Sequence, residues 1–127
     1  MPSYDAALFH PPAPVASVVL RDPSSGKSAA DVLMLIDCGA DVTLLPRSSL
    51  ESLGIDTAAG EEYELTAFDG STSMSRAVDV HLLFLRRTFR GRFLTTDDEC
   101  GVLGRDILNH LSILLNGPKL EWSEPGR

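Results

Sequence analysis

The sequence predicts an all-β domain: a small β-barrel, closed or partly open, with one or two short helices. Short apolar stretches alternate along most of the chain with clusters of turn residues, which is typical of short strands joined by tight turns. The 127 residues suffice for one hydrophobic core, and the 43% apolar and 23% charged content is ordinary for a folded domain. No internal repeat is evident. We expect one domain over residues 15–123, between an arm, 1–14, and a frayed tail, 124–127.

The first predicted strands lead to an aspartate. Four prolines in residues 1–14 predict an extended or loosely ordered arm. Residues 15–21 are largely apolar and predict a strand, which the turn cluster 22–27 separates from a returning strand over 30–36. The second strand ends at Asp37, so this aspartate is expected where the chain leaves the core.

The next stretch predicts a short strand followed by a short helix. Residues 42–45 are mostly apolar and read as a strand. Pro46 suits the first turn of a helix because its missing N–H has no partner to lose there. We therefore predict a helix over 47–53 that ends at Gly54.

A hairpin is predicted in the middle of the chain. Residues 63–68 read as a strand, and Asp69-Gly70 is a strong signal for a two-residue hairpin turn. The return begins at 71–74 and continues over 76–85. By its turn chemistry alone, this segment is an ordinary exposed hairpin.

The last third predicts further strands and a second helix. Residues 86–92 contain four arginines, which are interpreted as a solvated hairpin end, with a basic docking patch as the alternative. The remaining elements are a strand over 93–96, a polar loop over 96–99, a helix over 105–111, and strands 112–115 and 119–123 paired across Asn116-Gly117. Pro118 suits an edge strand.

The stretch Leu33–Pro46 contains the main candidate for chemistry. An apolar run reaches Asp37, breaks at Cys38-Gly39, and then resumes. An ionised carboxylate among apolar neighbours is costly unless something holds it, so Asp37 needs an explanation. The simplest one is that Asp37 caps a turn, as aspartate commonly does in loops. Gly39 permits a sharp turn and the close approach of another chain or a ligand.

Two motifs together indicate more than a turn. The first is Asp37-Cys38-Gly39-Ala40-Asp41 after an apolar strand, and the second is Val102-Leu103-Gly104-Arg105-Asp106. Over residues 15–123 the sequence resembles the retropepsin-like aspartic proteases, single-domain relatives of pepsin, which carry both motifs in this order. The resemblance implies a barrel of the retropepsin type, with the hairpin around Phe68-Asp69-Gly70 as a flap that closes over substrate.

The resemblance also implies a homodimeric aspartic endopeptidase. Aspartic proteolysis needs two carboxylates that share one proton: one activates a water as general base while the other polarises the scissile carbonyl. The chain has one Asp-Cys-Gly and no second Asp-x-Gly, so two copies would each contribute Asp37 across a two-fold axis. The terminal strands, around 15–20 and 120–122, would form or support the dimer sheet. The expected partners are a second copy and a peptide or protein substrate, and no metal or other cofactor is implied.

The other site roles follow from the same resemblance. Gly39 would present its carbonyl to substrate, and Asp41 would contact the substrate main chain while forming a buried pair with Arg105, whose loss would unfold or dissociate the protein. Cys38 and Arg105 would support the site. The expected substrate-binding residues are Gly39, Ala40, Asp41, Val42, Phe68, Asp69, Gly70, Val102 and Leu103.

Cys38 departs from the family pattern, which has threonine or serine there to donate a hydrogen bond across the dimer axis. A thiol is a larger and weaker donor. Three outcomes follow from this substitution. Cys38 substitutes adequately and gives a slower or weaker-dimer protease, it leaves an inactive dimerisation or peptide-binding module, or it makes activity redox-sensitive if the two thiols approach each other. Cysteine as the nucleophile is disfavoured because no histidine is near it in sequence.

Charge and composition exclude several other classes. The formal net charge of −7 argues against nucleic acid and anionic membranes as partners. No apolar run approaches the length of a membrane span, and the first residues lack the pattern of a signal peptide. Two cysteines make no disulfide framework, and three scattered histidines suggest no metal site. We expect a cytoplasmic protein with free thiols.

Overall fold

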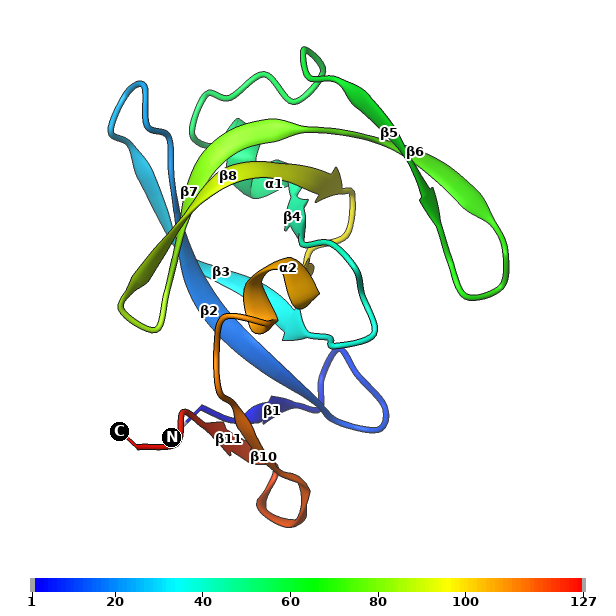
Figure 1. Ribbon diagram of the computed structural model, residues 1–127, viewed down its shortest axis with the longest axis vertical. Helices are drawn as coiled ribbons and strands as arrows, with labels where there is room; N and C mark the ends of the chain where they lie inside the picture. Colours follow the sequence, from blue (N-terminus) through cyan, green and yellow to red (C-terminus); the bar gives the residue numbers. More distant parts are fainter. Residues whose placement is uncertain (1, 127) are drawn as a thin grey trace.

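The computed structural model describes residues 2–126 and shows an all-β barrel (Figure 1). Within this part of the chain, six strands follow one another around the barrel, and β7 pairs back to β2 to close it. In spatial order they are β2 (Ala13–Arg21), β3 (Ser28–Ile36), β9 (Gly101–Leu103), β4 (Leu44–Pro46), β8 (Arg87–Thr96) and β7 (Val78–Phe84). The predicted fold class, including a closed barrel, is confirmed.

The barrel closes because alternate residues of its long strands are apolar and face a common interior. Along β7 the buried residues are Val78, Val80, Leu82 and Phe84, while the residues between them are more exposed. The same alternation in β2 and β3 contributes Ala16, Val18, Leu20, Val32 and Met34 to the core. Two short helices, α1 (Arg47–Glu51) and α2 (Arg105–Leu108), add Leu50 and Ile107.

Strand β9 positions the region around Asp37. It lies between β3 and β4, parallel to β3 and antiparallel to β4. The loop that joins β3 to β4 carries Asp37 and therefore lies next to the end of β9, where Gly104 begins α2. Two segments more than sixty residues apart in sequence thus meet at one end of the barrel.

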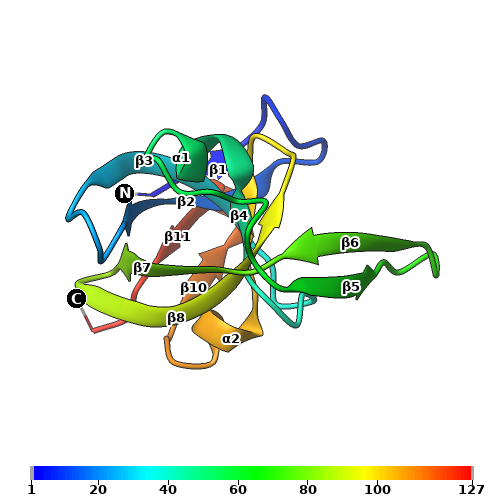
Figure 2. The ribbon, with the colours of Figure 1, turned by 90° about the horizontal axis from the view of Figure 1, so that it is seen from above.

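The hairpin of β5 (Glu62–Thr66) and β6 (Thr72–Arg76) projects from the barrel (Figure 2), and it curves toward the side on which the Asp37 loop lies (Figure 1). Its base is fixed to β8 because the buried Ser75 hydroxyl donates to the Thr95 carbonyl (2.8 Å) and accepts the Thr95 N–H (2.9 Å). The turn is longer than the predicted two residues: the strands end at the Thr66–Thr72 pair, which leaves a five-residue connection.

The two ends of the chain pair with each other beneath the barrel (Figure 1). Strand β1 (Tyr4–Asp5) pairs with β2, and β10 (Leu114–Asn116) pairs with β11 (Glu121–Ser123). Tyr4 N–H donates to the Leu120 carbonyl (2.9 Å), and Trp122 N–H donates to the Pro2 carbonyl (3.1 Å). The described part of the N-terminal arm is therefore hydrogen-bonded to the domain, and β2 begins two residues before the predicted start.

The C-terminal turn also differs from the prediction. A 3-10 turn, Gly117–Lys119, replaces a two-residue connection, and Pro118 lies in this turn rather than in an edge strand. The Asn116 side chain stabilises the turn by accepting the Lys119 N–H (3.3 Å). The predicted tail includes Arg127, which lies outside the described residues, but its first residue, Glu124, forms an ion pair with Arg86 (3.8 Å).

Three further boundaries were predicted too generously or misplaced. The helices end at Glu51 and Leu108 rather than at 53 and 111. The arginine-rich segment begins at a solvated hairpin end, as interpreted, but extends beyond it: the turn falls at Leu85-Arg86, and residues from Arg87 onward belong to β8. Within residues 2–126, no helix combines the length and the apolar character that crossing a membrane requires.

Candidate functional site

Asp37 lies at the end of β3 in a tightly hydrogen-bonded turn. Its N–H donates to the Leu103 carbonyl of β9 (3.1 Å), and its own carbonyl accepts the Ala40 N–H (3.1 Å). The carboxylate oxygen Oδ1 accepts the Gly39 N–H (2.9 Å). Asp37 therefore caps its turn, as the simplest interpretation predicts, and this cap also fixes the direction of a half-buried carboxylate.

Arg105 holds the rest of the loop. Its backbone N–H donates to the Ala40 carbonyl (2.9 Å), and its Nη1 donates to the Cys38 carbonyl (2.7 Å). Its Nη2 donates to Asp41 Oδ1, which forms the predicted ion pair. One arginine thus contacts three residues of the loop, which fits the fork of donors in a guanidinium group.

The prediction that the Asp41–Arg105 pair is buried was wrong for the single chain. The side chains are 82% and 43% exposed. Water screens such a pair, so its contribution to stability is small, and removing Arg105 does not leave a buried charge. The sequence indicated that Asp41 pairs with Arg105 but gave no information on how exposed to solvent the pair is.

A polar contact that the sequence interpretation missed lies beneath this loop. Thr43 is fully buried, and its hydroxyl donates to Asp106 Oδ1 (2.6 Å) while its N–H donates to Asp106 Oδ2 (3.1 Å). The same hydroxyl accepts the Gly104 N–H (3.1 Å). These bonds join β4 to the start of α2. A threonine inside an apolar strand was the available signal, because a buried hydroxyl requires a partner.

Gly104 is required where the two segments cross. A Cβ added to Gly104 would lie 2.5 Å from both the carbonyl carbon and the oxygen of Val42, and 3.0 Å from the Ala40 oxygen. Backbone atoms cannot move aside as a side-chain end can. Glycine therefore permits α2 to start directly against the Asp37 loop.

The tip of the β5–β6 hairpin approaches Gly39. The Phe68 side chain is 97% exposed, yet its Cζ lies 3.4 Å from the position of a Cβ at Gly39. The tip is held by a hydrogen bond from Ala67 N–H to the Ser71 carbonyl (2.8 Å) and by Gly70 at φ +85°. Hydrogen bonds from the Ser71 side chain and backbone lower the pKa of Asp69.

The remaining predicted site residues divide between the surface and the core. Val42 is 36% exposed and Val102 is half-buried, so both are near the surface beside the loop. Leu103 differs from the prediction: it is fully buried in the core, and its contact with the site is the carbonyl that accepts the Asp37 N–H. Ala40 serves mainly through its backbone, bonded to Asp37 and Arg105.

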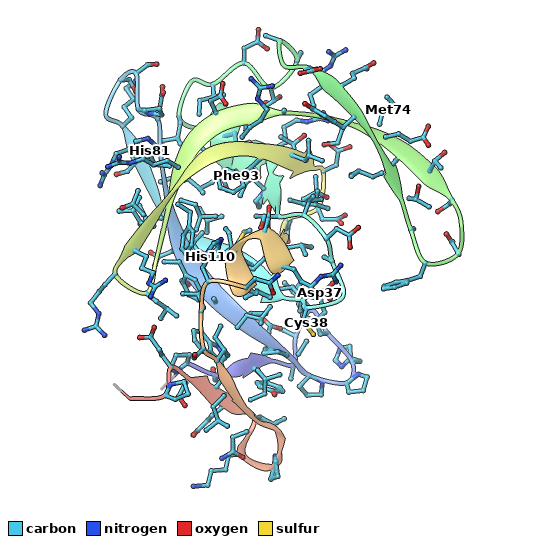
Figure 3. All side chains as sticks on the ribbon, viewed as in Figure 1. Asp37, Cys38, Met74, His81, Phe93 and His110 are labelled. Atoms are coloured by element: carbon cyan, nitrogen blue, oxygen red, sulfur yellow. The ribbon has the colours of Figure 1, made fainter. Side chains whose placement is uncertain are left out.

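The assembled site consists of one oriented carboxylate, that of Asp37, in an open loop that the tip of the hairpin approaches. Its chemistry depends on this carboxylate. Figure 3 shows Asp37 and Cys38 on one side of α2 and His110 on the other, with His81 far from both. Neither His81 nor His110 is therefore placed to act as a base for Cys38. A single carboxylate can act as a general base on water, but it needs a second acid to polarise a carbonyl.

Comparison with known proteins supports the fold. No protein-family model matches the sequence, and no curated protein matches it closely in sequence. Among solved structures, EIAV protease complexed with the inhibitor HBY-793 matches with a TM-score of 0.58 and 24% identity, over 77% of this chain and 86% of that one. At this identity the likeness concerns the fold alone. The chain thus has a retropepsin-like fold, similar to that of a retroviral protease.

Proposed function

We propose that the protein is a homodimeric aspartic endopeptidase. The observation that carries the proposal is the position of Asp37: its carboxylate is fixed by Gly39 N–H in a loop that Arg105 holds and that the tip of the hairpin approaches. Each chain provides one such carboxylate. Two chains related by a two-fold axis would bring two copies of Asp37 together and complete the site.

The proposed reaction uses the two carboxylates in different protonation states. Two like charges about 3 Å apart cannot both ionise readily, so the pair would share one proton. The ionised Asp37 would take a proton from a water as it attacks the peptide carbonyl, while the protonated Asp37 of the second copy would donate a hydrogen bond to the carbonyl oxygen. Proton transfer to the leaving nitrogen would then complete hydrolysis.

The substrate proposed is an extended peptide held between the loop and the hairpin. Gly39 would offer its carbonyl, and Asp41, whose side chain is largely exposed, would contact the peptide main chain. Val42 and Val102 would contact apolar side chains near the scissile bond, and Phe68 would cover the peptide from above. Main-chain hydrogen bonds would provide affinity and the apolar contacts selectivity.

The C-terminal hairpin is the proposed dimer surface. Leu114, Leu115 and Leu120 are 55%, 51% and 43% exposed, which places three large apolar side chains on one small element. Clustered exposed leucines indicate an interaction surface. The N-terminal strand is already paired with Leu120 and Trp122 of its own chain, so the second copy would meet the β10–β11 hairpin rather than exchange that strand. β2 lies within the barrel and would only support this surface.

A catalytically silent peptide-binding module is the second candidate, and Cys38 is the observation that favours it. Cys38 is exposed, and its carbonyl is bonded to Arg105, so the loop conformation does not depend on the side chain at this position. A scaffold with this loop would still bind peptide without hydrolysing it. Retention of Asp37 favours the protease, because Arg105 and Asp41 alone would satisfy a scaffold.

Cleavage of an unstructured protein mixture from about pH 4 to pH 7 tests the proposal. Wild type is compared with Asp37→Asn, which is nearly isosteric and keeps an oxygen to accept the Gly39 N–H. We expect cleavage by wild type and none by the variant, with both proteins equally folded. A folded, dimeric wild type that cleaves nothing, with or without reductant, contradicts the protease; Cys38→Thr then tests whether the thiol is the cause.

A further inference from the structure

A shallow cleft of about 600 Å³ lies outside the candidate active site, between the first half of β8 and the end of α2. Its walls include Arg87, Arg90 and Arg92 from β8 and His110 beyond α2, and its apolar lining includes Phe89 and Phe93. Figure 3 shows His110 on the side of α2 away from Asp37. The cleft is therefore a separate feature of the barrel surface.

The charges of the cleft are opposite to those of the molecule. The chain carries a formal net charge of −7, yet three arginines line this one cleft. Arg92 is already paired with Glu61 (3.1 Å) and Asp79 (3.5 Å). Among the residues that the structure describes, Arg87 and Arg90 form no ion pair with a carboxylate. Two unneutralised guanidinium groups thus remain at the cleft.

The one acidic side chain in the cleft wall is occupied. Both oxygens of Asp106 accept hydrogen bonds from Thr43, so its charge is directed into the fold rather than toward Arg90. Arg87 is held in place because its Nη1 donates to the His110 carbonyl (2.7 Å), which leaves its other N–H groups for a ligand. The cleft therefore offers free N–H donors on positively charged groups, which suit a negatively charged ligand.

The backbone of β8 is open along the same cleft. On one edge, residues Arg87–Phe93 pair with β7 in an unbroken antiparallel register. On the other edge, β4 pairs only with Leu94–Thr96, and within residues 2–126 no strand pairs with the preceding part. Alternate N–H and C=O groups there face outward and form a template on which another strand can add.

We propose that this edge of β8 binds an extended acidic peptide segment of a partner protein. The peptide would add as a strand beside Arg87–Phe93. Arg87 and Arg90 are three residues apart in β8 and so lie on opposite faces of the strand, and one acidic side chain on each face of the peptide would meet them. The other peptide side chains on the face of Arg87 would lie against Phe89 and Phe93. Free arginines, an apolar floor and an open strand edge occur together here, and these are what such a peptide requires. The proposal does not depend on catalysis at Asp37.

Fluorescence anisotropy with a short labelled peptide of glutamate and threonine, in which glutamates fall on both faces of the extended strand, tests the proposal. The protein carries Asp37→Asn so that hydrolysis cannot remove the probe, and the wild type is measured alongside. Arg87→Glu with Arg90→Glu should weaken binding about tenfold or more, because two charge-assisted hydrogen bonds become repulsive. Arg47→Glu reverses the charge of an exposed arginine that does not line the cleft, and it should leave the affinity unchanged.

Two further probes separate strand addition from simple attraction. A peptide with lysine in place of glutamate should not bind. A glutamate peptide that is N-methylated at the alternate residues facing β8 should bind with an affinity about tenfold or more lower, because the N–H groups that would donate to β8 are removed. Should the double variant not fold, Arg90→Gln replaces it, since Arg90 is exposed. Unchanged affinity after these arginine substitutions, or equal binding of the lysine or N-methylated peptide, overturns the proposal.

Discussion

Thr43 and Asp106 show how single residues fix the candidate site. The buried Thr43 hydroxyl accepts the Gly104 N–H and donates to Asp106, so one side chain connects β4 with the beginning of α2. Arg105, next in sequence, then reaches Cys38 and Asp41 from above. The geometry of the Asp37 loop therefore depends on a buried contact more than on the exposed ion pair.

Replacing Thr43 with valine should lower the free energy of unfolding by about 1–3 kcal/mol, because the Asp106 carboxylate loses one donor and the Gly104 N–H loses its acceptor. Chemical denaturation measures the change. Thr72→Val is the control: Thr72 is exposed on β6 and should change stability by less than about 0.5 kcal/mol. A Thr43→Val protein as stable as wild type would show that the contact is unimportant.

The Cys100 thiol should react more slowly in the folded protein than in the unfolded chain. Burial raises the pKa of the Cys100 thiol, so at a given pH less of it is the reactive thiolate. Cys38→Ser leaves Cys100 as the remaining thiol. Near neutral pH, alkylation of Cys100 should be slower in the folded protein than in protein unfolded by urea. The difference between the two rates should narrow as the pH rises through the raised pKa. Mass spectrometry follows the reaction; equal rates at neutral pH would contradict the burial.

At the scale of elements, the sequence predicted most strands but not their neighbours. Alternating apolar residues identified β2, β3 and β7, and the two motifs identified the loop and α2. The place of β9 between β3 and β4 depends on contacts across some sixty residues, which local pattern does not encode. The exposure of Asp41 and Arg105 is equally non-local, so the prediction of a buried pair was wrong for the single chain.

Turns were the weakest part of the prediction, and the reason is specific. Asp69-Gly70 and Asn116-Gly117 both suggested two-residue connections, but side-chain hydrogen bonds favoured longer ones. Asn116 accepts the Lys119 N–H and supports a 3-10 turn, and Asp69 accepts the Ser71 N–H at the hairpin tip. Asparagine and aspartate stabilise several turn types, so the dipeptide alone does not select one.

The C-terminal hairpin is the element on which the proposed dimer depends. Leu114 in β10 pairs with Ser123 in β11. Trp122, the residue before Ser123, is buried against Phe84 with ring centroids 5.9 Å apart, and it attaches the hairpin to the barrel without involving the Leu114 side chain. Leu114→Glu should therefore leave the fold intact and weaken dimerisation at least tenfold, because a charge would be buried between copies. Sedimentation equilibrium measures the association; Met74→Glu, also at an exposed apolar residue, is the control. Unchanged association would place the interface elsewhere.

At the scale of the whole molecule, the barrel supports two open features at different ends of α2. One is the Asp37 loop beneath the projecting hairpin, and the other is the arginine-lined cleft along β8. The retropepsin-like fold accounts for the first, since it brings the two sequence motifs together. The protease proposal then requires a second copy, because one chain supplies one carboxylate.

Mixing wild type with Asp37→Asn tests this central claim most directly. After subunits have re-equilibrated, a site made from two copies of Asp37 is intact only in dimers of two wild-type chains. Activity should then follow the square of the wild-type fraction, about one quarter of the full rate in an equal mixture. A rate that falls in proportion to the wild-type fraction, to about one half, would mean that each chain acts alone and would contradict the account.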